Sequence, residues 1–198
     1  MKKKTYLTLL LVLFSTGCGL CLNGGWIKAK GVAGQVLLER SWQRSQQSRA
    51  VVKGWPWADT HPVARMTVFR LGVDLIVLEG DSGEVLAFGP GHYRASAAVG
   101  GEGNCILAGH RDTSFSFLRE LVAGDLIMLE DRDRQNHGYR VRNMEVVSRE
   151  HLYLKRGETG WLTLITCYPF DALEPGGPLR YVVYAEKASA EADQFSGG

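Results

Sequence analysis

A thiol, an imidazole and a guanidinium stand in three separate segments of this chain, each beside a turn-forming sequence. Cys167 follows the apolar run Thr-Leu-Ile-Thr, His110 follows a glycine, and Arg180 comes just after Glu-Pro-Gly-Gly-Pro. A cysteine attacks carbonyl groups as the thiolate, and a histidine commonly takes or returns the proton. An arginine is always charged and can donate hydrogen bonds to the oxygen of the attacked carbonyl. Together these residue types predict acyl transfer through a covalent intermediate.

Position along the chain matters for these three residues, because each type taken alone is more often structural. His110 and Cys167 each end an apolar, strand-like run, and Arg180 begins the next such run. Barrels expose functional side chains where their strands end. We therefore expect the three side chains to meet at one rim of a sheet.

Short apolar runs separated by glycine-containing turns follow one another after residue 64. About eight such runs indicate a barrel or a sandwich, and the shortage of helices between them argues against alternating strands and helices. We predict a mostly β fold, a closed eight-stranded barrel, with short helices near 91–98 and 114–121. The predicted strands are 65–71, 73–79, 85–88, 104–109, 126–130, 138–148, 161–166 and 179–186.

Three lysines at the amino terminus precede an uncharged, apolar run over residues 6–22. The run is just long enough to cross a bilayer, and lysines before it favour a domain outside the cytoplasm. We predict that residues 1–25 form a single-pass anchor in the cell membrane. A cleaved signal peptide is the alternative, and Cys18 keeps a lipoprotein open. In each case the domain is exported.

One domain is expected over residues 26–187, followed by a disordered Ala/Ser/Gly-rich tail over residues 188–198. The 198 residues are 45% hydrophobic, which suffices for one full core. The formal net charge of +2 comes from interspersed signs, so we predict no nucleic-acid partner. Residues 26–49 should form a helix whose apolar stripe packs on the domain. That stripe comprises Val32, Val36, Leu37 and Trp42.

The segment after this helix, Trp55 to Asp59, contains a proline that ends helical structure and predicts a connector. Trp55 and Trp57 either line a substrate groove or anchor the connector on the core. Beside His110, Arg111 and Asp112 either orient the imidazole or form a surface ion pair.

The remaining cysteines and histidines do not form a second site. Cys105 lies in an apolar run and is expected to be a packing residue, although a disulfide with Cys167 stays open. His61, His92, His137 and His151 have no zinc-site spacing, so we predict no metal and no cofactor. The acidic residues Glu79, Asp81 and Glu84 are compatible with a calcium site but are more typical of a solvated turn.

The segment Thr163-Leu164-Ile165-Thr166-Cys167 fits the Thr-Leu-x-Thr-Cys motif of the sortases at every fixed position. The chain resembles this family of membrane-anchored cysteine transpeptidases over roughly residues 26–187, with the histidine before the cysteine and the arginine after it. The sequence segments 55–59, 108–113 and 166–170 are most similar to the sortase class found in Gram-negative proteobacteria, class GN.

The resemblance implies a reaction, a substrate and a location. The substrate is a protein with a carboxy-terminal sorting signal similar to Leu-Pro-x-Thr-Gly, cleaved between Thr and Gly, and an amine accepts it from a Cys167 thioester. His110 acts as general acid and then as base, and Arg180 donates to the carbonyl oxygen. The class implies the inner membrane, with the domain in the periplasm.

Two further residues are candidates for substrate binding. Thr166 is assigned by family analogy, through its backbone or hydroxyl, although threonines in strands are usually structural. Tyr168, with Phe170, either walls the substrate site or belongs to the core.

Two other functions remain open. One is a cysteine peptidase that only hydrolyses peptides, although papain-like enzymes place the cysteine before the histidine and on a helix. The other is a non-catalytic β-barrel that docks exported proteins. Replacement of Cys167 separates the enzymes from the docking module.

Overall fold

The computed structural model describes residues 2–151, 160–172, 174 and 176–188. The chain forms two compact units, residues 1–37 and 38–198. Helix α1 (Lys2–Ser48) provides the first unit and the opening turns of the second. Within the described residues, no helix combines the length and the apolar character needed to cross a membrane. The membrane anchor over residues 1–25 stays a prediction, and most of the predicted tail lies outside the described residues.

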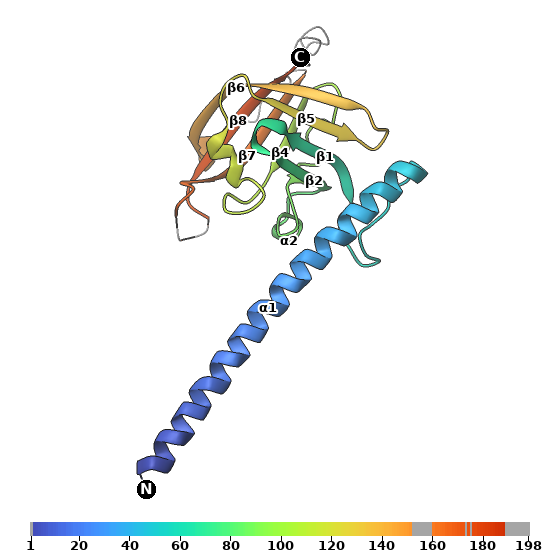
Figure 1. Ribbon diagram of the computed structural model, residues 1–198. Helices are drawn as coiled ribbons and strands as arrows, with labels where there is room; N and C mark the ends of the chain where they lie inside the picture. The colour runs from blue at the N-terminus through green and yellow to red at the C-terminus, as the bar shows by residue number, and fades with distance from the viewer. Residues whose placement is uncertain (1, 152–159, 173, 175, 189–198) are drawn as a thin grey trace. The chain divides into compact units, whose positions relative to one another are not determined.

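The second unit is built around a closed barrel of eight strands, as predicted (Figure 1). Neighbouring strands follow the order β1-β2-β3-β4-β7-β8-β6-β5 and back to β1. The strands are β1 (Pro62–Val68), β2 (Val73–Glu79), β3 (Gly91–His92), β4 (Asn104–Ala108), β5 (Leu126–Asp131), β6 (Asn136–Ser148), β7 (Trp161–Tyr168) and β8 (Leu179–Lys187). Short helices join them: α2 (Gly83–Leu86), η1 (Phe69–Leu71), η2 (Ser116–Glu120) and η3 (Arg149–His151).

The segment between β2 and β4 differs from the prediction. The predicted strand 85–88 is replaced by α2, which begins after Ser82, whose side chain accepts a hydrogen bond from Val85 N. The predicted helix 91–98 is replaced by β3, a two-residue strand that pairs with β2 and β4. Gly91 fits there because a Cβ would lie 2.1 Å from Gly80 O. The count of eight strands is right because one error offsets the other.

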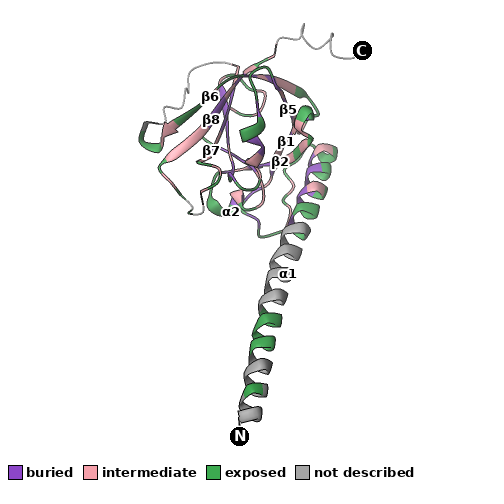
Figure 2. Cartoon of the chain, turned by 60° about the vertical axis from the view of Figure 1, so that its left-hand side comes forward, coloured by how far each residue is buried: buried purple, intermediate pink, exposed green. Residues whose placement is uncertain are grey.

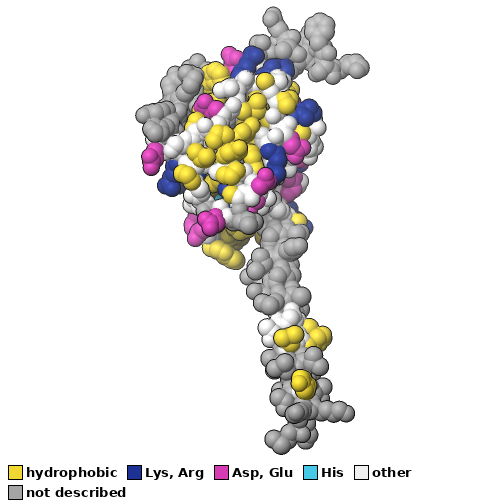
Figure 3. Space-filling model, turned by 90° about the vertical axis from the view of Figure 1, so that its left-hand side faces the viewer, with side chains coloured by type: hydrophobic (Ala, Val, Ile, Leu, Met, Phe, Trp, Pro, Cys, Tyr) yellow, Lys and Arg dark blue, Asp and Glu magenta, His cyan; other side chains and the backbone are white. Residues whose placement is uncertain are grey.

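The barrel core is apolar and comes from inward-facing residues of nearly every strand. Residues such as Met66, Leu129, Leu164 and Val183 are fully buried, and Phe115 closes the cluster from the segment after β4. Figure 2 shows these buried positions in the strands and also in the last turns of α1. Figure 3 shows hydrophobic side chains gathered on one face of the barrel, with charged side chains around them.

A second cluster covers the outer side of β2 and includes the end of α1. Leu38 and Trp42 are 1% exposed and pack with Ile76 and Leu78. The predicted stripe is therefore right for Trp42 but wrong for Val36 and Leu37, which are exposed, whereas the side chain of Val32 lies outside the described set. Leu38 and Trp42 are four residues apart and so share one helix face.

An ion pair outside the core joins two loops of the barrel. Arg70 Nε and Nη2 lie 2.6 Å from the two carboxylate oxygens of Asp125, and Val122 N donates to Oδ2 at 2.8 Å. The Arg70 hydrogen bond is the main cause that holds the pKa of Asp125 below its ordinary value, and the Val122 hydrogen bond acts in the same direction.

This ion pair predicts a pH-dependent loss of stability in Asp125→Asn. A carboxylate whose pKa falls on folding stabilises the fold above its unfolded pKa of about 4, and this contribution is lost as the pH falls through the folded value. We expect Tm to drop by roughly 2–5 °C at pH 7, with the difference shrinking below about pH 4. Thermal unfolding at pH 7 and pH 3 measures it, with exposed Asp133→Asn as control. An equal difference at both pH values would contradict it.

Candidate active site

Cys167 and Arg180 are direct partners across the antiparallel strands β7 and β8. Side chains directly opposite one another share one face of a sheet, with Cβ atoms about 4.5–5.5 Å apart. Successive side chains of a strand point to opposite faces, so Leu164 and Thr166 lie on the face of β7 opposite to Cys167. Leu164 belongs to the barrel core. The thiol and the guanidinium therefore both start from the outer face of the barrel, where Cys167 is half-buried.

His110 approaches the same place from β4, which runs parallel to β7. Ala108 pairs with Ile165, and Gly109 N continues the ladder by donating to Ile165 O at 3.1 Å. Extending the register by two residues brings exposed His110 level with Cys167. Cys167 and Arg180 thus lie on neighbouring strands, and His110 lies in the turn that follows the strand on the other side of β7.

The backbone on both sides of His110 is held by hydrogen bonds. Thr166 Oγ1 donates to Gly109 O at 2.7 Å, and Phe115 N donates to His110 O at 2.9 Å. A side chain at Gly109 would lie 2.6 Å from the Phe115 ring, so only glycine fits. Thr166 is 2% exposed, and its hydroxyl therefore ties β7 to β4. The Thr166 hydroxyl is thus engaged with Gly109 O. A contact between the Thr166 backbone and the substrate stays a prediction.

Arg111 is buried, and the interpretation as a surface pair with Asp112 is wrong. The side chain is 7% exposed, and its Nη2 donates to Ala172 O at 2.7 Å and to Glu174 O at 2.6 Å. These carbonyls belong to the loop between β7 and β8, which joins Cys167 to Arg180. Arg111, which follows His110 directly, therefore links the turn after β4 to the loop between Cys167 and Arg180. Sequence reasoning missed this because nothing local signals the burial.

We expect Arg111→Met to lower kcat by about tenfold or more with a smaller change in KM, because misplacing catalytic groups by about 1 Å is costly. Loss of its charged hydrogen bonds should also cost about 1.5–3 kcal/mol of folding free energy. Steady-state kinetics and denaturant unfolding measure both effects. Arg119→Met is the matched control, since Arg119 reaches the same loop but is exposed and contacts Phe170 and Asp171. Equal kinetic losses in the two variants would contradict a specific role for Arg111.

Arg180 is held where the loop enters β8. Its Nη1 donates to Gly177 O at 2.7 Å and to Leu179 O at 2.8 Å. These two hydrogen bonds hold the guanidinium group of Arg180 in place. Its other nitrogens, Nε and Nη2, can still donate hydrogen bonds. The side chain can therefore serve as a positioned donor beside Cys167.

Tyr168 lies on the other face of β7 from Cys167, in an aromatic cluster. Its ring centroid is 6.2 Å from that of Phe170 and 6.3 Å from that of Tyr181. Phe170 and Tyr181 pack against the barrel core. This geometry favours the core interpretation for Phe170 and gives no support to the predicted substrate contact of Tyr168.

Cys105 is confirmed as a packing residue. It is 1% exposed within the core, and burial raises the pKa of its thiol to about 12. Its partner in register is core residue Leu162, so it faces the inside of the barrel while Cys167 faces the outside. Both thiols are free, and the disulfide that the sequence left open does not form.

Glu79 has partners that the sequence did not predict. It lies 3.1 Å from Nδ1 of buried His92 and 3.6 Å from Nε of Arg94. Asp81 and Glu84 are exposed in the turn and α2 that follow, as in a solvated turn. Over the described ranges, no three His, Cys, Asp or Glu residues lie close enough together to hold a metal ion.

The amino-acid sequence is similar to sequences of known proteins. The model of the sortase domain matches residues 66–188. "Sortase D" of Bacillus subtilis (strain 168) is 30% identical over 125 residues, which make up 61% of each chain. The present chain therefore spans about three fifths of the length of this curated relative.

Solved structures show the same barrel. Sortase E from Streptomyces avermitilis is 31% identical, with 65% of this chain and 88% of that chain covered and a TM-score of 0.56. A Clostridium perfringens sortase D5 transpeptidase is 20% identical, with 79% and 96% covered and a TM-score of 0.61. The second likeness concerns the fold alone.

Proposed function

Because this chain belongs to the sortase family, we propose that it is a cysteine transpeptidase in which Cys167 is the nucleophile, His110 the proton carrier and Arg180 the oxyanion donor. The observation that carries the proposal is the cross-strand pairing of Cys167 with Arg180, with His110 two residues beyond the end of the adjacent parallel strand β4. A general acid or base and a charged donor must both lie within hydrogen-bond reach of the reacting atoms. The pairing of β7 with β8 and with β4 brings the segments that carry these groups side by side, which supports the proposal.

In the first step, the proton of the Cys167 thiol passes to His110, and Sγ attacks the carbonyl carbon of the scissile peptide bond. Arg180 donates to the carbonyl oxygen while that oxygen carries negative charge. The C–N bond then breaks, His110 gives its proton to the leaving amine, and the substrate remains on Cys167 as a thioester.

In the second step, an amine attacks the thioester carbon. His110 takes a proton from the entering nitrogen, the C–S bond breaks, and the thiol is restored. The net result is exchange of one amide for another, with no oxidant, reductant or cofactor. Water in place of the amine would yield the free acid.

The substrate class and the location are parts of this proposal. The substrate is a protein with a sorting signal similar to Leu-Pro-x-Thr-Gly, cleaved between Thr and Gly, and the enzyme is of the proteobacterial class. The domain acts outside the cytoplasm, an expectation that rests on the lysines and the uncharged run over residues 6–22. Cell fractionation with protease treatment of spheroplasts tests it, and a domain that stays protected in intact spheroplasts would contradict it.

The alternative of a purely hydrolytic peptidase differs in what resolves the thioester. Mass spectrometry of a Leu-Pro-x-Thr-Gly peptide incubated with the full chain and rising concentrations of oligoglycine or diaminopimelate separates the two. We expect the amide product to grow at the expense of the free acid. Free acid alone, at every concentration of both amines, would assign hydrolysis as the reaction.

A further inference from the structure

A pocket of about 600 Å³ opens between the connector that follows α1 and the segment from Ser82 to Phe88. Its walls include Trp55, Trp57, Val85 and Phe88. Neither segment carries a residue of the catalytic site, which lies on β4, β7 and β8. A volume of this size is typical of binding sites for small molecules or short peptide segments.

The two tryptophans of the connector differ in their environment, although the sequence left the same two interpretations open for both, a wall of a substrate groove or an anchor on the core. Trp55 is half-buried, and its ring centroid is 5.0 Å from that of Phe88. Thr60 Oγ1 donates to Glu79 O at 2.7 Å, which ties the end of the connector to β2. Trp57, in contrast, is 80% exposed. Trp55 therefore anchors the wall, and Trp57 presents its ring to a partner.

The pocket lining carries charge of one sign, and Lys53 lies just before it in the chain. The ionisable residues that line the pocket are Asp59 and Glu84, and both are exposed carboxylates. A lysine or arginine side chain can lay its aliphatic stem along an aromatic surface and keep its charged end in water. That end is attracted both by the face of a tryptophan and by carboxylates. A negatively charged partner would be repelled.

We propose that this pocket binds a lysine- or arginine-bearing segment of the protein substrate, outside the residues that are cleaved. The identity of the partner as substrate rests on the proposed function, whereas binding of a basic segment does not. The pocket would add affinity for the correct protein without contacting the reacting atoms. Substrate choice would then depend on two separate surfaces of the enzyme.

Binding is measured by fluorescence anisotropy on the full chain with a labelled, end-capped Leu-Lys-Leu-Lys peptide. Trp57→Ala should weaken binding by about 3- to 30-fold, the range of one cation–π contact. The double variant Asp59→Asn, Glu84→Gln should weaken it by about 3- to 10-fold, and this loss should fade as salt is raised. A matched Leu-Glu-Leu-Glu peptide should not bind.

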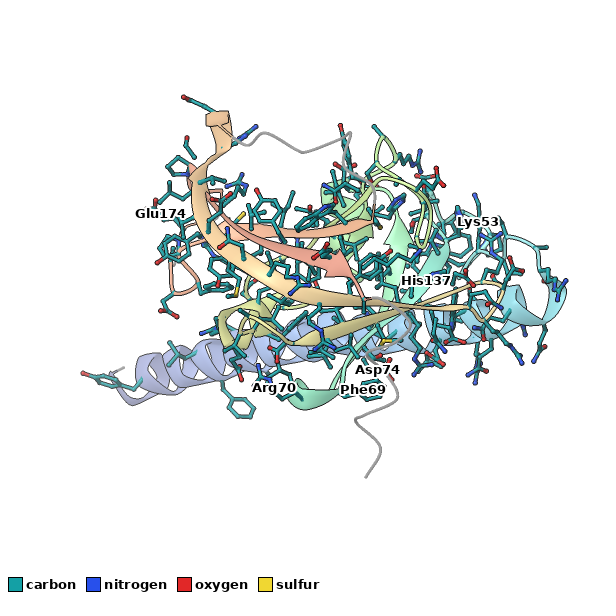
Figure 4. All side chains as sticks on the ribbon, turned by 90° about the horizontal axis from the view of Figure 1, so that it is seen from above. Lys53, Phe69, Arg70, Asp74, His137 and Glu174 are labelled. Atoms are coloured by element: carbon teal, nitrogen blue, oxygen red, sulfur yellow. The ribbon has the colours of Figure 1, made fainter. Side chains whose placement is uncertain are left out.

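Two matched variants control for general surface effects. Phe69→Ala removes another exposed ring, 76% exposed on η1, and Figure 4 shows Phe69 apart from Lys53, which lies just before the connector. Asp81→Asn removes an exposed carboxylate next to the pocket that does not line it. Both should bind the lysine peptide within about twofold of the unchanged chain, the spread expected of surface substitutions away from a binding site.

Three results would overturn the proposal: equal binding of the two peptides, equal losses in the pocket and control variants, or no binding of the lysine peptide at millimolar concentration. Cys167→Ala should bind the lysine peptide normally, so the measurement does not depend on catalysis. A chain that binds this peptide as described but never cleaves a sorting peptide would refute the proposed function and leave the pocket intact.

Discussion

Replacing Cys167 by alanine should abolish turnover, with a loss of at least about 10⁴-fold and no covalent adduct on the protein. No other described thiol can substitute on this face, since Cys105 points into the core and burial raises its pKa to about 12. Intact-protein mass spectrometry during turnover should show the acyl adduct on the unchanged chain only. Steady-state assays with the same peptide measure the rate.

Cys105→Ala is the matched control for this experiment. It removes a buried thiol from the neighbouring strand and should lower stability modestly, by about 1 kcal/mol, while the acyl adduct still forms. Full activity in Cys167→Ala, or an adduct on it, would refute the assignment of the nucleophile. Unchanged handling of the peptide by Cys167→Ala would also favour the docking module over either enzyme.

Replacing His110 by alanine should lower kcat/KM by about 10²- to 10⁴-fold, the usual contribution of a positioned general acid or base. The substitution removes an exposed side chain, while the hydrogen bonds that hold this turn come from the backbone and from Thr166. Thermal stability should therefore change little. Added imidazole should restore part of the rate, because it can carry the proton that the side chain no longer carries.

His137→Gln is the control, since His137 lies on β6 and pairs with Asp131 at 2.8 Å (Figure 4). Its activity should stay within about twofold, and imidazole should have no effect on it. A comparable loss in both variants, or a loss in His110→Ala that follows a drop in Tm, would indicate a structural role for His110.

The sequence predicts the barrel and the places of Cys167, His110 and Arg180 at strand ends well, because both depend on local patterns. Alternating apolar runs define strands such as β7, and Gly109 and the turn before Arg180 mark where strands end or begin. The pattern fails where tertiary contacts decide. The apolar segment 85–88 is not a strand, because Ser82 caps α2, which ends at Leu86 and is followed by a loop. Strand β3 has two residues and is defined by its pairing with β2 and β4.

The supporting residues of the site are the part that local patterns cannot give. Arg111 follows His110 in a polar stretch that is typical of a surface, yet the loop after β7 covers it and accepts its hydrogen bonds. Val36 and Leu37 have the right type for the buried stripe of α1, but the helix turns Leu38 and Trp42 inward instead. Such choices depend on partners far away in the chain.

Strand β7 lies between β4 and β8, and β8 also pairs with β6. Arg180 lies on β8, which comes after the other described strands in the sequence, and the contact between Thr166 and Gly109 spans 57 residues. Contacts of this separation form late in folding, because the closure entropy must be overcome first. Until the barrel closes, Cys167 is not held beside the proposed proton carrier, His110, and the proposed oxyanion donor, Arg180. An unfolded chain therefore lacks the arrangement on which the proposed acyl transfer depends.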